Sequence, residues 1–308
     1  MKRLLVTILL IAGSLIVVVP ARATFPSENG TIAFSSDRSA RFQIYSQRPR
    51  GGTLRQLTDA PGNSIIADWT PDGRHLVFDS DRVTSGCSDQ ACNVEIFVMA
   101  ADGDDVRRVT RSRGYDGAPA VSPDGETIVF ESDRDGNPEL YTRRLEGGKV
   151  TRLTDNGDFD FGPEWSPDGS HIAFASDRAR GEGTSDVYVM QADGSDVRKL
   201  TPSRLNAGVP DWSPDGDEIV FASNAAAPGT SNLYVIESDG SELEQLTDLA
   251  KDESAFFPSW SPDGHRIAFT SQHGDNVDIV TLRQNGSDIR RVTSSAAFDI
   301  APDWGSRS

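Results

Sequence analysis

The sequence predicts an all-β protein, a six-bladed β-propeller of four-stranded antiparallel blades. A phrase of the form Trp-Ser-Pro-Asp-Gly recurs at steps of 44 to 52 residues, and its first positions are Trp69, Val121, Trp165, Trp212, Trp260 and, in a shortened copy, Trp304. Six tight-turn pairs and six apolar-Thr pairs recur with the same period. A period of this size indicates a repeat architecture in which each unit is one supersecondary motif.

Each repeat contains signals for four strands and the turns between them. In one unit we expect the first strand over 161–165 and the second over 171–176, joined by Ser-Pro-Asp-Gly. The third strand is expected over 185–190, and a hairpin at Asp193-Gly194 leads to the fourth over 197–201, because Gly accepts the positive φ of a tight hairpin. Four antiparallel strands in a unit of this length predict a propeller blade.

The same two signals recur in every unit. The turn between the third and fourth strands is Gly51-Gly52, Asp102-Gly103, Gly147-Gly148, Asp193-Gly194, Asp239-Gly240 and Asn285-Gly286. The apolar-Thr pair that closes the unit ends at Thr58, Thr110, Thr154, Thr201, Thr247 and Thr293. Six copies of each signal predict six blades.

The two ends of the chain predict how the ring closes. Residues 30–36 match the second strand of the other units, so the first unit has no innermost strand of its own. Residues 298–304 match a first strand with nothing after it. Pairing of these two strands would complete a blade and remove the edges that an open array would expose. We therefore expect one propeller domain over residues 24–308.

Residues 1–23 have the pattern of a secretory signal peptide. Lys2 and Arg3 precede an apolar run over 4–19, and Ala21-Arg22-Ala23 resembles a cleavage site. The pattern predicts export to the periplasm, the cell envelope or the medium, with no membrane span after cleavage; an uncleaved anchor is the alternative. In an oxidising compartment, Cys87 and Cys92 are expected to form a small disulfide loop.

The charge of the chain restricts its partners. The formal net charge is −17 and the isoelectric point is about 4.6. Nucleic acids and anionic membrane surfaces would be repelled by such a protein. We expect a monomer whose partner is an envelope or extracellular protein, with a glycan or another small ligand as the alternative.

The repeated motifs resemble the TolB-like, or WD40-like PD40, propeller repeats of bacterial envelope and secreted proteins. The matching features are Trp-Ser-Pro-Asp-Gly, an apolar strand ending in Phe, Ser-Asp-Arg, and the closing Leu-Thr, and they recur over nearly the whole chain after residue 24. This resemblance implies a six-bladed ring. It does not specify a function, because such blades occur in binding proteins, scaffolds and enzymes.

Two repeated sets of charged residues could be functional or structural. Ser-Asp-Arg occurs at Asp37-Arg38, Asp81-Arg82, Asp133-Arg134 and Asp177-Arg178; we expect its Asp to cap a loop and its Arg to cover a neighbouring blade. Asp116, Asp160 and Asp299 hold equivalent positions in Asp-x-x-Pro and are candidates for a binding site at the channel mouth. A second acidic set precedes the repeated Trp: Asp68, Glu164, Asp211 and Asp303.

Rings of carboxylates can bind Ca²⁺, which prefers oxygen ligands, so a calcium site formed by Asp116, Asp160 and Asp299 is one hypothesis. The alternative is that these side chains cap turns or pair with arginines that face the channel. No other cofactor is predicted.

The sequence contains no recognised catalytic motif. Neither Gly-x-Ser-x-Gly, His-Glu-x-x-His nor a phosphate-binding Gly-rich loop is present. We therefore predict a non-enzymatic binding or scaffold protein that acts through the face bearing the second-to-third-strand loops and the connections between blades, since these loops vary in length and sequence. A secreted carbohydrate-active enzyme or glycan-binding module that uses the acidic channel mouth is the alternative.

Overall fold

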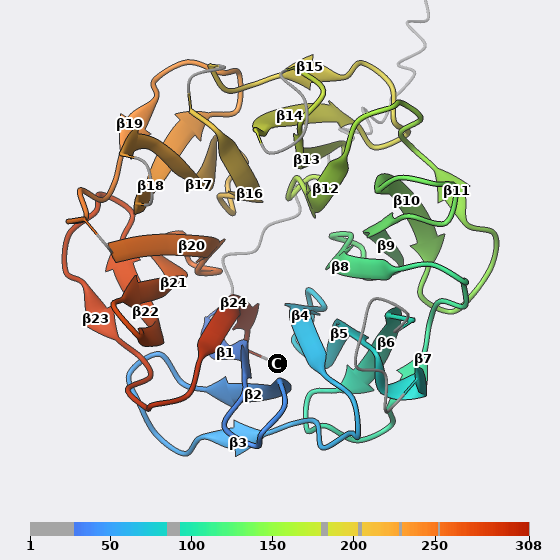
Figure 1. The fold of residues 1–308 in the computed structure, drawn as a ribbon, viewed down its shortest axis with the longest axis horizontal. Helices are drawn as coiled ribbons and strands as arrows, with labels where there is room; N and C mark the ends of the chain where they lie inside the picture. Colours follow the sequence, from blue (N-terminus) through green and yellow to red (C-terminus); the bar gives the residue numbers. More distant parts are fainter. Residues whose placement is uncertain are drawn as a thin grey trace, which may run out of the picture.

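A computed structural model describes residues 28–84, 93–179, 184–202, 205–227, 230–251 and 253–307. The predicted signal peptide over 1–23 and the predicted disulfide of Cys87 and Cys92 lie outside these residues. Six four-stranded antiparallel sheets surround a central axis, as Figure 1 shows. The predicted fold class is confirmed.

The strands of each blade are given from the axis outward. The first blade is β24 (Asp299–Ser306), β1 (Asn29–Ser36), β2 (Gln43–Gln47) and β3 (Arg55–Gln56). The second is β4 (Ser64–Trp69), β5 (His75–Ser80), β6 (Glu95–Ala100) and β7 (Arg107–Arg108). The third is β8 (Asp116–Val121), β9 (Thr127–Ser132), β10 (Glu139–Arg144) and β11 (Thr151–Arg152).

The remaining three blades follow the same order. The fourth is β12 (Asp160–Trp165), β13 (His171–Ser176), β14 (Asp186–Gln191) and β15 (Arg198–Lys199). The fifth is β16 (Ala207–Trp212), β17 (Glu218–Ala227), β18 (Thr230–Glu237) and β19 (Glu244–Gln245). The sixth is β20 (Glu253–Trp260), β21 (Arg266–His273), β22 (Asn276–Arg283) and β23 (Arg290–Arg291). A single 3₁₀ turn, η1 (Arg82–Thr84), occurs in the described part of the chain, where no helix is long and apolar enough to cross a membrane.

The ring closes between the two ends of the chain, as predicted. β24 pairs antiparallel with β1, and Trp304 lies opposite Ile32. The apolar faces of the blades are buried against one another: one core cluster contains Val187 of β14 together with Trp212 of β16 and Phe221 of β17. Since a single blade cannot bury its own faces, closure of the ring completes the last of these interfaces.

The repeated Thr explains why each blade ends where it does. The hydroxyl of Thr58 accepts a hydrogen bond from the Ile44 backbone N–H at 2.9 Å, and Thr110 does the same for Ile96 at 2.9 Å. The equivalent bond recurs in the other four blades. Each Thr therefore satisfies a third-strand donor beyond the two-residue fourth strand, which is shorter than the sequence pattern predicts.

Every innermost strand has a β-bulge at the same position. The bulged residues have left-handed backbone conformations with φ between 38° and 56°: Ile66, Ala118, Gly162, Val209, Phe257 and Ala301. Five of these six residues precede a Pro, which cannot donate to the strand ladder and is therefore tolerated at a bulge. Left-handed backbone costs a non-Gly residue about 1 kcal/mol, so the five non-Gly bulges represent strain at the channel wall.

Hydrogen bonds between turns define the two faces of the ring. On one face, the hairpin before the fourth strand bonds to the Pro-Asp-Gly turn of the same blade, as from Ala101 N–H to Arg74 O at 2.8 Å. On the other face, each innermost strand begins beside the third strand of the preceding blade, as from Asp116 N–H to Val94 O at 3.0 Å. The second face carries the loops that vary, and we call it the variable-loop face.

Candidate functional site

Asp116, Asp160 and Asp299 are fully buried in ion pairs within three different blades. Each is the first residue of an innermost strand, at the variable-loop end. Their partners are arginines of the same blades, at 2.7 Å for Arg134 with Asp116, 2.5 Å for Arg178 with Asp160 and 2.6 Å for Arg38 with Asp299. A ligand would have to displace an arginine from each carboxylate, so the geometry favours a structural role for this set.

The arginine of each pair lies over two aromatic rings of its own blade. The Arg134 guanidinium carbon is 5.3 Å from the centroid of Phe130 and 4.8 Å from that of Tyr141. Arg38, Arg82 and Arg178 lie over aromatic pairs in the same way. The prediction that this arginine covers a neighbouring blade is therefore wrong, because its planar cation fits the face of the ring pair beside it.

The aspartate of Ser-Asp-Arg caps the start of the innermost strand. Asp133 accepts a hydrogen bond from the Tyr115 backbone N–H at 2.7 Å, and Asp177 accepts one from Phe159 at 2.7 Å. The first and second blades have the same bond. The predicted capping role is confirmed.

Three blades lack this ion pair. In the second blade Ser64 stands where the buried Asp would be and accepts a hydrogen bond from Arg82 at 3.0 Å, whereas the other two blades omit both charges. In the fifth blade Ala207 stands where the buried Asp would be and Ala225 where its Arg would be. In the sixth blade Ala255 and His273 occupy these positions. The two charges are thus absent together, which avoids leaving a buried carboxylate without its cation.

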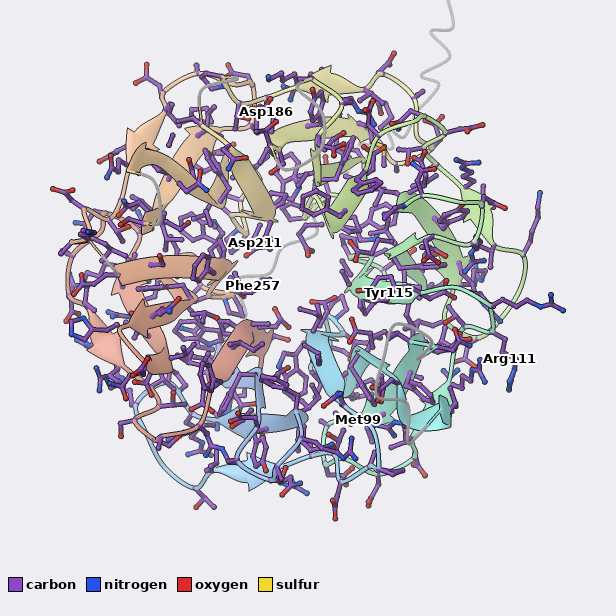
Figure 2. All side chains as sticks on the ribbon, in the orientation of Figure 1. Met99, Arg111, Tyr115, Asp186, Asp211 and Phe257 are labelled. Atoms are coloured by element: carbon purple, nitrogen blue, oxygen red, sulfur yellow. The ribbon has the colours of Figure 1, made fainter. Side chains whose placement is uncertain are left out.

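The second acidic set is the one that the structure brings together. Asp68, Glu164, Asp211 and Asp303 line the channel where two cavities meet: about 240 Å³ on the side of the bulges and about 140 Å³ on the side of the Pro-Asp-Gly turns. Both cavities are lined by these four carboxylates and by Ser259. Figure 2 shows Asp211 and Phe257 beside the central opening. We call this set the channel carboxylates.

Burial and mutual repulsion favour the protonated forms of the channel carboxylates. Burial raises the pKa of Asp211 to about 8 and that of Asp303 to about 6. Burial and the neighbouring charge of Asp303 raise the pKa of Asp68 well above its usual value. Burial and the charge of Asp68 do the same for the pKa of Glu164. The group therefore shares protons near neutral pH.

Three of the channel carboxylates also join neighbouring blades. Asp303 accepts a hydrogen bond from the Trp69 backbone N–H at 2.7 Å, Asp68 from Val121 at 2.6 Å, and Asp211 from Trp260 at 2.6 Å. Ser259 makes the equivalent bond from Trp304 at 3.1 Å. Glu164 instead accepts from Trp165 of its own blade at 3.2 Å.

The larger cavity has apolar walls above the channel carboxylates, and we call it the apolar cup. Half-buried side chains line it, including Ile66, Phe161, Val209 and Phe257. Tyr115 lies at the rim of this cavity, as Figure 2 shows. Its ring is close to Gly117, and its hydroxyl is hydrogen-bonded to Glu131. Sequence analysis missed these residues, although Asp-x-x-Pro marks the segment that carries them.

The structure offers no preformed metal site in its described part. Among those residues, no group of three or more His, Cys, Asp or Glu side chains is arranged to hold a metal ion. The proposed calcium ligands Asp116, Asp160 and Asp299 lie in separate ion pairs, so they do not form a common coordination sphere.

The comparison with known proteins agrees with this geometry. Residues 86–180 and 159–304 match the PD40 family, described as the TolB beta propeller domain. The chain belongs to this family. The PD40 propeller is 34% identical over 95 residues to an uncharacterized protein of Agrobacterium fabrum, and 32% identical over 139 residues to a TolB homolog of Chlorobium luteolum. These matches span 31% and 34% of this chain, but only 30% and 32% of the two relatives.

A solved structure extends the likeness to the whole ring. The PD40 propeller superposes on TolB from Acinetobacter baumannii with a TM-score of 0.75 and 23% identity, covering 90% of this chain and 66% of that one. At this identity the likeness shows the fold alone.

Proposed function

We propose that this PD40 propeller is exported and acts by binding a protein of the cell envelope or the extracellular space at the variable-loop end of its channel. The apolar cup is the observation that carries the proposal. It is concave, it is walled mainly by apolar side chains and it ends on a few converging polar groups, which is the usual composition of a binding pocket. Export is supported by the pattern of residues 1–23.

The left-handed bulges support this role. They present Val209 and Phe257 at the cup wall with backbone φ values of 51° and 48°. Strained backbone persists where the surrounding structure holds it, and such strain is concentrated at binding and catalytic sites. A partner side chain of apolar character would fit a compartment of about 240 Å³.

The double variant V209G/F257G tests the proposal. Glycine relieves the left-handed backbone strain, and this gain offsets the lost side-chain contacts. The free energy of unfolding of the double variant should therefore stay within about 1 kcal/mol of the parent's. Binding should fall about thirtyfold, because a buried aromatic anchor contributes about 2 kcal/mol. The measurement is quantitative recovery of proteins from native envelope and culture fractions, followed by titration of any protein recovered.

The matched control is V197G/I289G, which removes two exposed apolar side chains near the opposite face. A protein recovered by the parent and the control but lost with V209G/F257G supports binding at the cup. Equal recovery by all three proteins would place binding elsewhere.

A secreted carbohydrate-active function is the second candidate, and the channel carboxylates favour it. Their raised and mutually dependent pKa values resemble those of groups that exchange protons in catalysis. The expected result is release of reducing ends from neutral and uronic oligosaccharides by the parent, with at least a hundredfold loss in D211N. Absence of turnover by the parent leaves the binding proposal as the sole candidate.

A further inference from the structure

A hollow of about 1510 Å³ lies at the seam where the ring closes, on the face of the Pro-Asp-Gly turns. In five blades a Pro-Asp-Gly turn joins the first two strands, but the first blade takes β24 and β1 from opposite ends of the chain and has no such turn. Elsewhere the turn proline lies beside the turn glycine of the next blade, as Pro71 does beside Gly125. Because this contact is absent at the seam, the face is hollowed there. We call this cavity the seam hollow.

The lining of the seam hollow is basic, although the chain carries a net charge of −17. Its charged side chains include a single carboxylate, Asp263, and seven arginines: Arg48, Arg50, Arg55, Arg266, Arg283, Arg290 and Arg307. The hairpin between β2 and β3 of the first blade places Arg48, Arg50 and Arg55 at the rim of the hollow, and this hairpin contains no acidic residue. The same hairpin in the second blade carries Asp102, Asp104 and Asp105 instead.

Part of this positive charge has no internal partner. Asp288 accepts ion pairs from Arg266, Arg283 and Arg290, and Glu28 pairs with Arg307. The side chains of Arg48 and Arg50 are exposed, and within the described residues their guanidinium groups make no hydrogen bond or ion pair. Their guanidinium groups are therefore available to an anion, and guanidinium binds carboxylates through two parallel hydrogen bonds.

We infer that the seam hollow is a second binding site, which takes an acidic peptide segment of a partner protein. Clusters of arginines recognise acidic peptide motifs through charge-assisted hydrogen bonds. A hollow of about 1510 Å³ is larger than the pocket that a single small ligand occupies, so a chain of several residues fits it better.

An anionic glycan fits the lining less well, because no free indole face is presented to a sugar ring. The Trp304 side chain is 4% exposed. The Trp69 ring is covered by the backbone of Gly305, where an added Cβ would lie 2.6 Å from the ring. The lining thus offers guanidinium groups together with the amides of Gln284 and Asn285, whereas the amide of Asn29 already donates to Asp263 at 2.9 Å.

The test is fluorescence anisotropy with a labelled glutamate-rich peptide and its glutamine-rich counterpart, using the purified protein. The R48Q/R50Q variant removes the two unpaired arginines and should weaken glutamate-peptide binding about tenfold, because each lost contact is a charge-assisted pair near the surface. Binding by the parent should also weaken as salt is raised, since the charges are solvent-exposed. The glutamine peptide should not bind.

The matched control is R111Q/R113Q, which makes the same change in charge between β7 and β8 on the variable-loop face. Both arginines are exposed, and Figure 2 shows Arg111 at the rim of the ring. Binding retained by this control and lost in R48Q/R50Q supports the inference. Equal loss in both variants, no binding of the glutamate peptide, or binding of oligogalacturonate in its place would each overturn it.

Discussion

The Asp160→Ala protein is expected to have a free energy of unfolding about 3 kcal/mol below that of the parent. Asp160 is fully buried and pairs with Arg178 at 2.5 Å, while Asn156 donates to it at 2.8 Å. Removing one partner of a buried ion pair leaves the other charge without compensation, which costs about 3 to 5 kcal/mol. Equilibrium unfolding in urea, followed by tryptophan fluorescence, measures this difference.

A double-mutant cycle with Arg178→Ala separates the ion pair from its surroundings. Arg178→Ala should destabilise at least as much, because it leaves a fully buried carboxylate and also uncovers the rings of Phe174 and Tyr188. The double variant should lose clearly less than the sum of the single variants, since Ala207 and Ala225 of the fifth blade show that a blade folds without either charge. Additive losses, or a stable Asp160→Ala protein, would mean that the carboxylate is free for a ligand.

The architecture could be predicted from the sequence because its signals are local and repeated. Trp-Ser-Pro-Asp-Gly specifies a turn through Pro and Gly, and the closing Thr is one hydrogen-bonding side chain at a constant spacing. Ring closure could also be predicted, because residues 298–304 match a first strand and residues 30–36 a second.

The candidate site could be predicted only in part, because periodicity does not report which way a side chain points. Asp-x-x-Pro identified Asp160, which points into its own blade, whereas the residue before the Pro lies on the channel wall. The one-residue bulge exchanges these directions. The Pro that follows Val209 and Phe257 marks the segment, but neither residue type indicates a left-handed φ.

The sequence shows that Asp211 occupies a repeated position, directly before Trp212. That its side chain lies near those of Asp68 and Asp303 depends on the meeting of six blades at one axis, which the repeat does not show. The seam hollow is likewise invisible in sequence, because Arg48 and Arg290 are separated along the chain and are brought together by closure.

The channel carboxylates predict that the protein loses stability as the pH rises from about 5 to about 9. Their folded-state pKa values are raised, that of Asp211 to about 8. At a pH between the unfolded-state pKa, near 4, and the folded-state pKa, the folded protein holds protons that the unfolded chain has released. The contribution of the channel carboxylates to the free energy of unfolding is therefore highest below about pH 4 to 5. It falls as the pH rises through their folded-state pKa values.

The D211N variant isolates this effect. Asparagine keeps an oxygen that can accept the Trp260 backbone N–H, now 2.6 Å from Asp211, but it cannot ionise. We expect the stability of D211N relative to the parent to increase between pH 5 and pH 9 by at least about 2 kcal/mol, which corresponds to a gain in relative melting temperature of roughly 5 °C. Differential scanning fluorimetry across this pH range measures both quantities.

Asp168→Asn is the matched control, because this turn carboxylate has the opposite behaviour. Partial burial raises its pKa, but hydrogen bonds from Ser170 and Ser166 outweigh burial and leave the pKa below its usual value. The charged form of Asp168 is thus the stabilising one, so D168N should be no more stable than the parent at pH 9 and should keep the parent's slope. If D211N kept that slope as well, Asp211 would already be ionised in the folded protein over this pH range, and the channel beside it would have to be hydrated.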